Sequence, residues 1–256
     1  WARVVKEFYH YSLGTFLINQ VVDGILAISQ WEKIEMIKKG VNPNLIKIIG
    51  LGIEKEATFD VNKIASKSAK VLVKKIQNYI IQVARIHPIK NFETVINALP
   101  LINKKIKFII VGPVQNLEYK KSLEALIEKL NLKNRVLFLG AVSVKDKFYL
   151  IRHAEMMVHM ATHEGYCIAV LEGLSQGLVC IVANNTALPY LVKDKVNGYC
   201  IETKDYQSLA EKVNYVLDKA NIKETKKIKS NNKKTFSKRT WKQMSKELFA
   251  LYIKML

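Results

Sequence analysis

Glu164 and Glu172 are two carboxylates that flank the predicted start of a helix. A strand-like run over residues 155–161 leads into this stretch, and a helix-like run over residues 168–176 leads out of it. A helical side chain leans toward the helix N-terminus, so we expect Glu172 to lean toward the space that Glu164 borders. Free N–H groups and the positive end of the helix dipole face the same space. The stretch suits a ligand with phosphate and sugar hydroxyls; the alternative is a helix cap at Glu164 and an exposed Glu172.

Arg85 and Lys90 are a second chemical pair, placed directly after a predicted strand over residues 79–84. An arginine can hold two phosphate oxygens at once, and a lysine adds a point charge. The pair therefore suits a diphosphate at the carboxyl end of that strand. Two solvated surface cations are the competing interpretation in so basic a chain.

The histidines and cysteines form no pattern that predicts a metal centre or a nucleophile. His163 neighbours Glu164 and is a candidate pocket residue, whereas His159 lies in an apolar strand and is expected to be a core histidine. No two histidines have the spacing of zinc ligands. The sequence also contains no G-x-S-x-G elbow, no P-loop and no G-x-G-x-x-G motif. We therefore expect neither a metal nor a cofactor.

Apolar strands and amphipathic helices alternate from residue 78 onward. Strands are expected at 79–84, 107–112, 136–140, 156–161, 178–183 and 198–201, and helices at 91–101, 117–130, 143–153, 168–176, 188–192 and 205–219. This alternation predicts a doubly wound, Rossmann-like α/β domain with a parallel sheet covered on both faces. Ligands bind at the carboxyl ends of such strands, which is where Arg85, Lys90, Gly112 and Glu164 fall.

The charge of the chain is strongly positive, with 41 Lys and Arg against 22 Asp and Glu and a formal net charge of +19. Nucleotide phosphates, an anionic membrane surface and nucleic acid are all partners that such a charge would attract. The densest basic segment covers residues 219–239. Aromatic and basic residues are not interleaved as in RNA-binding proteins, so nucleic acid is the weakest of the three interpretations.

Membrane spans and disulfide frameworks are not predicted. No run of about 18 apolar residues occurs, which is the minimum for a spanning helix. Three cysteines, Cys167, Cys180 and Cys200, are widely separated, and the last two lie in apolar runs. Buried thiols suit a reducing compartment, so we expect a cytoplasmic protein.

Taken in order, these motifs resemble the carboxyl-terminal part of the retaining GT-B glycosyltransferases of group 1, also called family 4. The resemblance covers nearly the whole chain and includes the strand at 23–29, the strand at 48–53, the Arg85–Lys90 pair, Val111-Gly112, the strand at 136–140, the E-x7-E element of Glu164 and Glu172, and the final helix with Phe236 and Trp241. The E-x7-E element together with the upstream cation pair is the specific part of this resemblance.

The resemblance implies transfer of a sugar from a nucleotide-sugar donor to an acceptor, with retention at the anomeric carbon. The implied donor-binding residues are Arg85, Lys90, Gly112, Glu164, Gly165, Tyr166, Cys167, Ile168 and Glu172. In the family the cation pair holds the diphosphate, the first Glu contacts the donor sugar, and the second Glu binds the ribose hydroxyls. Arg85, Lys90 and Glu164 are accordingly the implied catalytic residues. Cations at the departing diphosphate would remove the need for a metal and for a protein nucleophile.

The chain departs from the family pattern at several positions, including one within the E-x7-E element and one directly after it. The family usually has glycine where Cys167 stands and alanine where Gly173 stands. A Cβ at position 167 is expected to restrict the loop or to crowd the phosphate.

The resemblance also divides the chain. Residues 1–54 are expected to be the truncated end of an N-terminal Rossmann-like domain, residues 55–77 a linker, residues 78–235 the nucleotide-sugar-binding domain, and residues 236–256 a C-terminal helix that returns toward the first domain. The chain starts without methionine and reads like the middle of a protein, so we expect a fragment that is inactive alone.

The expected partners are a nucleotide-sugar donor and a lipid-linked or glycan acceptor, with peripheral association at the inner face of the membrane. A different class of function is kept as the alternative. It is a non-catalytic basic module that binds an anionic membrane or partner and carries an inactive or incomplete nucleotide-sugar site.

Overall fold

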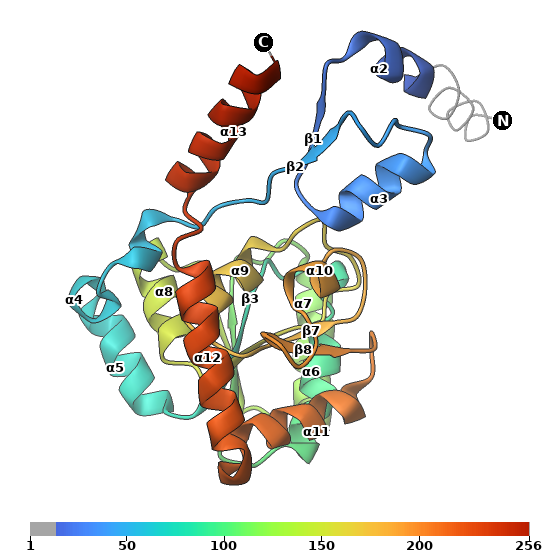
Figure 1. The fold of residues 1–256 in the computed structure, drawn as a ribbon. Coiled ribbons are helices and arrows are strands. Elements are labelled where there is room, and N and C mark those ends of the chain that lie inside the picture. Colours follow the sequence, from blue (N-terminus) through green and yellow to red (C-terminus); the bar gives the residue numbers. More distant parts are fainter. Residues whose placement is uncertain (1–13, 256) are drawn as a thin grey trace, which may run out of the picture.

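The computed structural model describes residues 14–255, and its main body is a six-stranded parallel sheet with helices on both faces (Figure 1). The strand order is β5-β4-β3-β6-β7-β8. The strands are β3 (Tyr79–Val83), β4 (Lys107–Val111), β5 (Val136–Gly140), β6 (Met156–His159), β7 (Cys180–Ala183) and β8 (Gly198–Ile201). The sequence predicted all six, with ends that differ by at most two residues. The doubly wound α/β class is therefore confirmed.

The four inner strands of this sheet are almost entirely buried. A parallel strand that is covered on both faces needs apolar residues at successive positions, which explains the continuous apolar runs of the sequence. One face carries α6 (Phe92–Ala98), α7 (Leu117–Lys129) and α11 (Tyr206–Leu217), and the other carries α8 (Val144–Arg152), α9 (Ile168–Ser175) and α12 (Ile222–Phe236). The short helix α10 (Leu188–Leu191) follows β7.

Side-chain caps fix the starts of several helices at the predicted residues. Ser143 accepts a hydrogen bond from the Asp146 N–H at the start of α8, and Asp205 accepts one from the Ser208 N–H at the start of α11. Such caps satisfy N–H groups that have no partner inside the helix.

A small unit precedes the main body and projects from it (Figure 1). It contains α2 (Thr15–Val21), β1 (Ile25–Ala27), α3 (Gln30–Lys38) and β2 (Ile46–Ile48), with β1 parallel to β2. Ser29 caps α3 by accepting a hydrogen bond from the Glu32 N–H at 3.1 Å. Strand β2 overlaps the strand expected at residues 48–53 only at Ile48. Residues 1–13 of the expected N-terminal domain remnant, which spans residues 1–54, lie outside the described residues.

Residues 55–76 form a 3-10 turn (Lys55–Thr58), α4 (Val61–Ile64) and α5 (Lys67–Ile76). These helices pack on α8, and their buried apolar side chains belong to the same core as the six-stranded sheet. The segment predicted to be a linker is therefore anchored on the main body.

The carboxyl-terminal segment contains two helices where the sequence predicted one. The Lys-rich run that was not predicted to be helical forms α12, and the final helix α13 (Trp241–Met255) begins later than the predicted residue 236. Between them the chain crosses to the end of the small unit. The Ile53 N–H donates to Arg239 O at 2.8 Å, and the Trp241 N–H donates to Ile53 O at 3.2 Å.

Gly52 is required at this crossing. A Cβ on Gly52 would lie 2.4 Å from Trp241 N, closer than any side chain tolerates. Helix α13 then runs beside the small unit.

None of the helices in the described residues has the length and apolar character to cross a membrane.

The order of the strands reverses its direction between β3 and β6. From β3 the chain moves outward through β4 to β5, and then returns to β6 and continues through β7 to β8 on the other side. Ligands of open α/β sheets bind at such a switch point, beyond the carboxyl ends of the strands. The loops that follow β3 and β6 therefore frame the candidate site.

Candidate functional site

Lys90 and Glu164 meet beyond the carboxyl ends of the neighbouring strands β3 and β6. The Lys90 Nζ lies 2.6 Å from Glu164 Oε1, and His159 Nε2 lies 2.6 Å from the same oxygen. The side chains of Lys90 and Glu164 are only 13% and 12% exposed. Two of the predicted site residues are thus in direct contact, although 74 positions separate them in the chain.

The Glu164 carboxylate is held in its ionised form. Burial alone would raise its pKa, but hydrogen bonds from His159 and Lys90 and the charges of both partners outweigh that effect and lower the pKa to about 2. His159 is buried as predicted for a core histidine, yet its ring faces Glu164 and belongs to the site. Its other nitrogen, Nδ1, has no hydrogen-bond partner among the described residues.

The loop after β3 is fastened to the loop after β6 by hydrogen bonds to the main chain. Gln82 is fully buried in β3, and its Nε2 donates to Lys90 O at 3.0 Å. Asn91 Nδ2 donates to Met160 O at 2.8 Å, and the Thr162 N–H donates to Ile89 O at 2.9 Å. Each bond satisfies a polar group that the loops would otherwise bury unpaired. Lys90 and Glu164 are therefore presented from a rigid frame.

Arg85 stands apart from this ion pair. Its side chain is exposed, and no ion pair of its guanidinium occurs within residues 14–255. The loop that carries it is joined to the loop after β4, because the Ile86 N–H donates to Pro113 O at 2.8 Å. Gly112 lies at φ +149°, and a Cβ there would lie 2.1 Å from Ala84 O. Packing between the two loops thus explains the glycine at position 112.

The start of α9 contains a strained residue. Cys167 caps the helix with φ 75° and ψ 79°, in the left-handed region that glycine occupies without cost. Its side chain is buried, and burial and the nearby Glu164 carboxylate raise the pKa of its thiol well above the usual value. The prediction that a Cβ at this position restricts the loop is consistent with this geometry.

Gly165 and Ile168 border the open side of the same helix start. A Cβ on Gly165 would meet nothing closer than Ile28 Cδ1 at 3.9 Å, and its φ lies outside the left-handed region. No contact in the described part of the chain therefore explains the glycine. Ile168 is the first residue of α9 and is partly buried, so its N–H is among those without a partner inside the helix.

Glu172 is in a different environment from Glu164. It is 3% exposed, and its Oε1 lies 2.5 Å from Lys147 Nζ on α8. Burial raises the pKa of Glu172, although Lys147 opposes that shift. The alternative in which Glu172 is an exposed helix residue is therefore wrong. Lys147 was not singled out in the sequence, because a helix–helix ion pair leaves no local pattern.

Three contacts join the loop after β6 to the small unit. The Tyr166 hydroxyl donates to Leu51 O at 3.4 Å, and the ring of His163 packs edge-on against Trp31 with 5.1 Å between centroids. Gly165 lies next to Ile28. The predicted pocket residues Tyr166 and His163 thus face the segment that precedes the main body.

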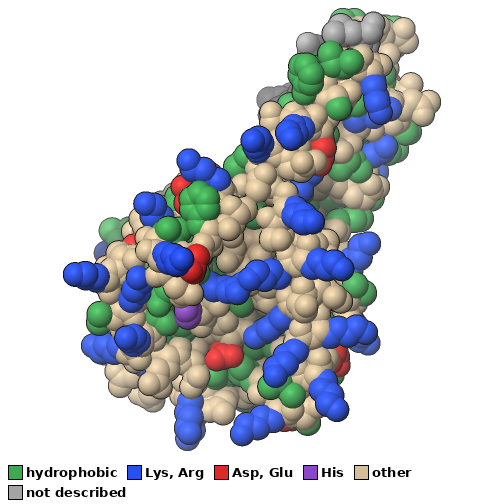
Figure 2. Space-filling view, turned by 60° about the vertical axis from the view of Figure 1, so that its left-hand side comes forward, with side chains coloured by type: hydrophobic (Ala, Val, Ile, Leu, Met, Phe, Trp, Pro, Cys, Tyr) green, Lys and Arg blue, Asp and Glu red, His purple; other side chains and the backbone are tan. Residues whose placement is uncertain are grey.

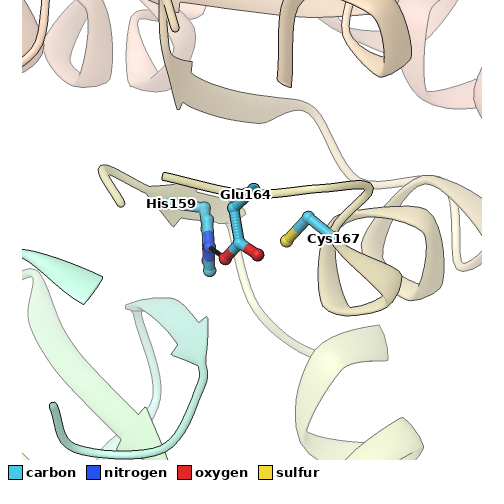
Figure 3. A group of neighbouring side chains, drawn as sticks. All are labelled: His159, Glu164 and Cys167. Carbon is cyan, nitrogen blue, oxygen red and sulfur yellow. Dashed lines mark hydrogen bonds and ion pairs between the residues drawn. The ribbon is translucent and has the colours of Figure 1, made fainter. Parts of the chain in front are cut away.

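A mixed cluster of ligand atoms lies within this site (Figure 3). Atoms of His159, Glu164 and Cys167 lie within 4.8 Å of one another. However, the Lys90 ammonium shares the Glu164 oxygen with His159, and the raised pKa keeps the Cys167 thiol protonated. A cation would have to displace Lys90 and remove the thiol proton. The absence of a metal requirement stays a prediction.

Comparison with known proteins links this geometry to a family. The family model described as glycosyl transferases group 1 matches residues 63–235. An uncharacterized glycosyltransferase of Methanocaldococcus jannaschii is 28% identical over 224 residues, covering 86% of this chain and 54% of that protein. The UDP-Gal:alpha-D-GlcNAc-diphosphoundecaprenol alpha-1,3-galactosyltransferase of Escherichia coli is 29% identical over 187 residues, covering 70% of this chain and 46% of that protein.

A similar fold occurs in solved structures. The Anabaena protein HepE, crystallised in complex with UDP and glucose, has a TM-score of 0.80 and 25% identity, covering 96% of this chain and 67% of that one. The sucrose-phosphate synthase of Thermosynechococcus elongatus has a TM-score of 0.80 at 17% identity, covering 96% of this chain and 61% of that one. The chain spans about half the length of these two curated relatives. Since the family model covers well over half of the chain, this protein belongs to the group 1 glycosyltransferases of GT-B fold.

Proposed function

We propose that this chain is the donor-binding part of a retaining glycosyltransferase of family 4, which transfers a sugar from a nucleotide-sugar donor. The observation that carries the proposal is the contact of Lys90 with Glu164 at the switch point between β3 and β6. In this proposal Lys90 binds the donor phosphate and the adjacent Glu164 carboxylate binds sugar hydroxyls. The start of α9 adds N–H donors and a positive dipole end at the same place.

In the proposed mechanism the departing diphosphate is stabilised by fixed positive charge. Arg85 has an exposed guanidinium that is available for two phosphate oxygens, and Lys90 supplies a second charge from the same loop. Such prearranged charge lowers the barrier because it needs no rearrangement during the reaction. The route requires neither a metal nor a protein nucleophile. Glu164 is already engaged by two donors, which supports a binding role for its carboxylate.

The relatives support a nucleotide-sugar donor and suggest the first probe. HepE was crystallised with UDP and with UDP-glucose, and the name of the Escherichia coli relative specifies UDP-Gal and a diphosphoundecaprenol acceptor. We therefore propose a nucleoside diphosphate sugar as donor and a lipid-linked or glycan acceptor. The family membership and these relatives do not favour the non-catalytic module.

Calorimetric titration with UDP and GDP tests the donor site. Arg85→Ala should weaken binding of the preferred nucleotide about tenfold, because a charge-assisted hydrogen bond to phosphate is lost. Glu172→Gln should weaken it by a similar factor if its carboxylate binds the ribose. Lys74→Ala, which removes an exposed charge from α5, is the control and should leave binding unchanged.

Thermal unfolding of each variant separates a lost contact from a lost fold. The site assignment is wrong if both variants are folded and bind like the parent. Binding of neither nucleotide by the folded parent chain would contradict the proposed donor class.

A further inference from the structure

A basic groove runs along α12, on the face of the sheet that also carries α8 and α9. It consists of two adjoining hollows of about 580 and 750 Å³. Five cationic side chains line it: Arg152, Lys229, Lys233, Lys234 and Lys238. Figure 2 shows the face shared by α5, α8 and α12, where Lys and Arg side chains are widespread and carboxylates are few. The groove is therefore a concentrated site of positive charge.

The groove is separate from the donor site. Its floor is formed by Ala154, just before β6, and by Gly177 and Leu178, just before β7. These residues lie at the amino ends of the strands, whereas the donor site lies beyond the carboxyl ends of β3 and β6. A ligand in the groove would thus contact none of the donor-binding residues.

The helix that supplies most of the cations is rigidly attached. Asn232 is buried in α12, and its Nδ2 donates to Leu178 O and to Asn197 O, both at 2.8 Å. Gly177 lies at φ +81°, and a Cβ there would come within 2.9 Å of Lys229 O. Helix α12 therefore lies directly on the floor of the groove. The main chain that carries Lys229, Lys233 and Lys234 is therefore fixed before any ligand arrives, which lowers the entropy cost of binding.

The cations of the groove have no carboxylate partner within hydrogen-bond distance. None of the five takes part in an ion pair within residues 14–255. Arg152 donates only to the main-chain oxygen of Gln176, at 2.9 Å. Asp60 is the one carboxylate in the lining, and Glu155 acts on Lys229 only through its charge. Burial lowers the pKa of Lys229, and burial together with Arg152 lowers that of Lys233.

Unpaired like charges gathered in a hollow repel one another, so an anion that enters the groove is stabilised by all of them. We propose that the basic groove is a binding site for a ligand with two or more phosphate charges. The hydroxyls of Ser230 and Ser237 line the same hollow and are available to the phosphate oxygens. The ligand is either a soluble phosphorylated compound or the headgroup of an anionic lipid, which share this chemistry.

Inorganic pyrophosphate, titrated by calorimetry, probes the soluble source. Saturating UDP is added first, so that the donor site does not contribute to the signal. Lys233→Ala/Lys234→Ala should weaken pyrophosphate binding at least about tenfold, because two charge-assisted contacts are lost. Lys74→Ala/Lys75→Ala removes the same charge from α5 and should change the affinity less than about twofold. Lys233→Arg/Lys234→Arg keeps the charge and should retain binding.

Flotation with phosphatidylglycerol vesicles, compared with phosphatidylcholine vesicles, probes the lipid source with the same three variants. The site is supported if either probe binds the parent, loses binding in Lys233→Ala/Lys234→Ala, and keeps binding in the α5 and arginine variants. The probe that binds then identifies the source of the ligand. Binding of neither probe overturns the proposed site. An equal loss in the α5 variant also overturns it, because the lysines then act only through the overall charge of the chain. Failure of UDP to bind would contradict the donor site alone, since the comparison of the three variants tests the groove whether or not UDP is bound.

Discussion

The two ends of the E-x7-E element lie in opposite electrostatic environments. Glu164 lies beyond the carboxyl end of β6, where His159 and Lys90 both donate to one oxygen and lower its pKa to about 2. Glu172 lies between α8 and α9 with Lys147 as its charged partner, and burial raises its pKa. The two carboxylates therefore differ in how securely they are ionised, although the sequence motif presents them as equivalent.

The difference shows how burial and hydrogen bonding compete for a carboxylate. Burial disfavours the charged form at both positions, and the number of donors decides the outcome. Two donors outweigh burial at Glu164, whereas one lysine does not at Glu172. The charge that the proposed ribose contact requires thus depends on Lys147, a residue of a neighbouring helix.

Lys147→Met should have the largest effect on stability. It leaves Glu172 buried without a counter-charge, which costs roughly 3–5 kcal/mol when one partner of a buried pair is removed. The raised pKa of Glu172 means that folding favours its neutral form. The loss should therefore be small below about pH 4.5 and grow as pH rises through the folded pKa. Urea unfolding at pH 4.5 and pH 8 measures it.

The double variant Lys147→Met/Glu172→Gln is the control for this prediction. It removes the unpaired buried carboxylate of Glu172 and should recover most of the unfolding free energy that Lys147→Met loses at pH 8. An equal loss at both pH values, or additive effects in the double variant, would show that Lys147 acts by packing and not by its charge.

Glu164 should give the opposite dependence on pH, with a somewhat smaller effect. Its lowered pKa stabilises the folded state above about pH 4.5, and this contribution is lost as pH falls toward 2. A shift from 4.5 to about 2 corresponds to roughly 3 kcal/mol. The difference in unfolding free energy between the parent and Glu164→Gln should therefore shrink between pH 5 and pH 2.5. A difference that stays constant over this range would contradict the ion-pair assignment.

The six strands were predictable because continuous apolar runs are typical of buried parallel strands, and β8 was predicted at its observed residues. Helix α12 was not predicted because it lacks an apolar pattern. Its buried residues are Thr225, Ile228 and Asn232, so two of the three are polar and the helix shows no apolar stripe. The tertiary hydrogen bonds of Asn232 and the burial of Ile228 in the main core explain why this segment packs on α9.

The site was predictable where a motif lies at the end of a strand. Residue types and strand ends placed Lys90 and Glu164 at one edge, and the structure brings them into contact. The residues that hold them were not predictable. Gln82 and His159 lie in apolar strands and resemble core residues, and Lys147 lies on another helix. Such supporting residues act through tertiary contacts, which no local spacing encodes.

Cys167 should give the smallest of these effects, and it concerns the segment that joins the two carboxylates. A non-glycine residue at φ 75° is strained, so Cys167→Gly should be about 1 kcal/mol more stable than Cys167→Ala, which loses the same thiol but keeps a Cβ. Thermal unfolding compares the two variants. If the Cβ also crowds the donor, Cys167→Gly alone should bind UDP more tightly than the parent. Equal stability of the two variants would show that the loop is not strained, and the preference for glycine in the family pattern would then require the ligand.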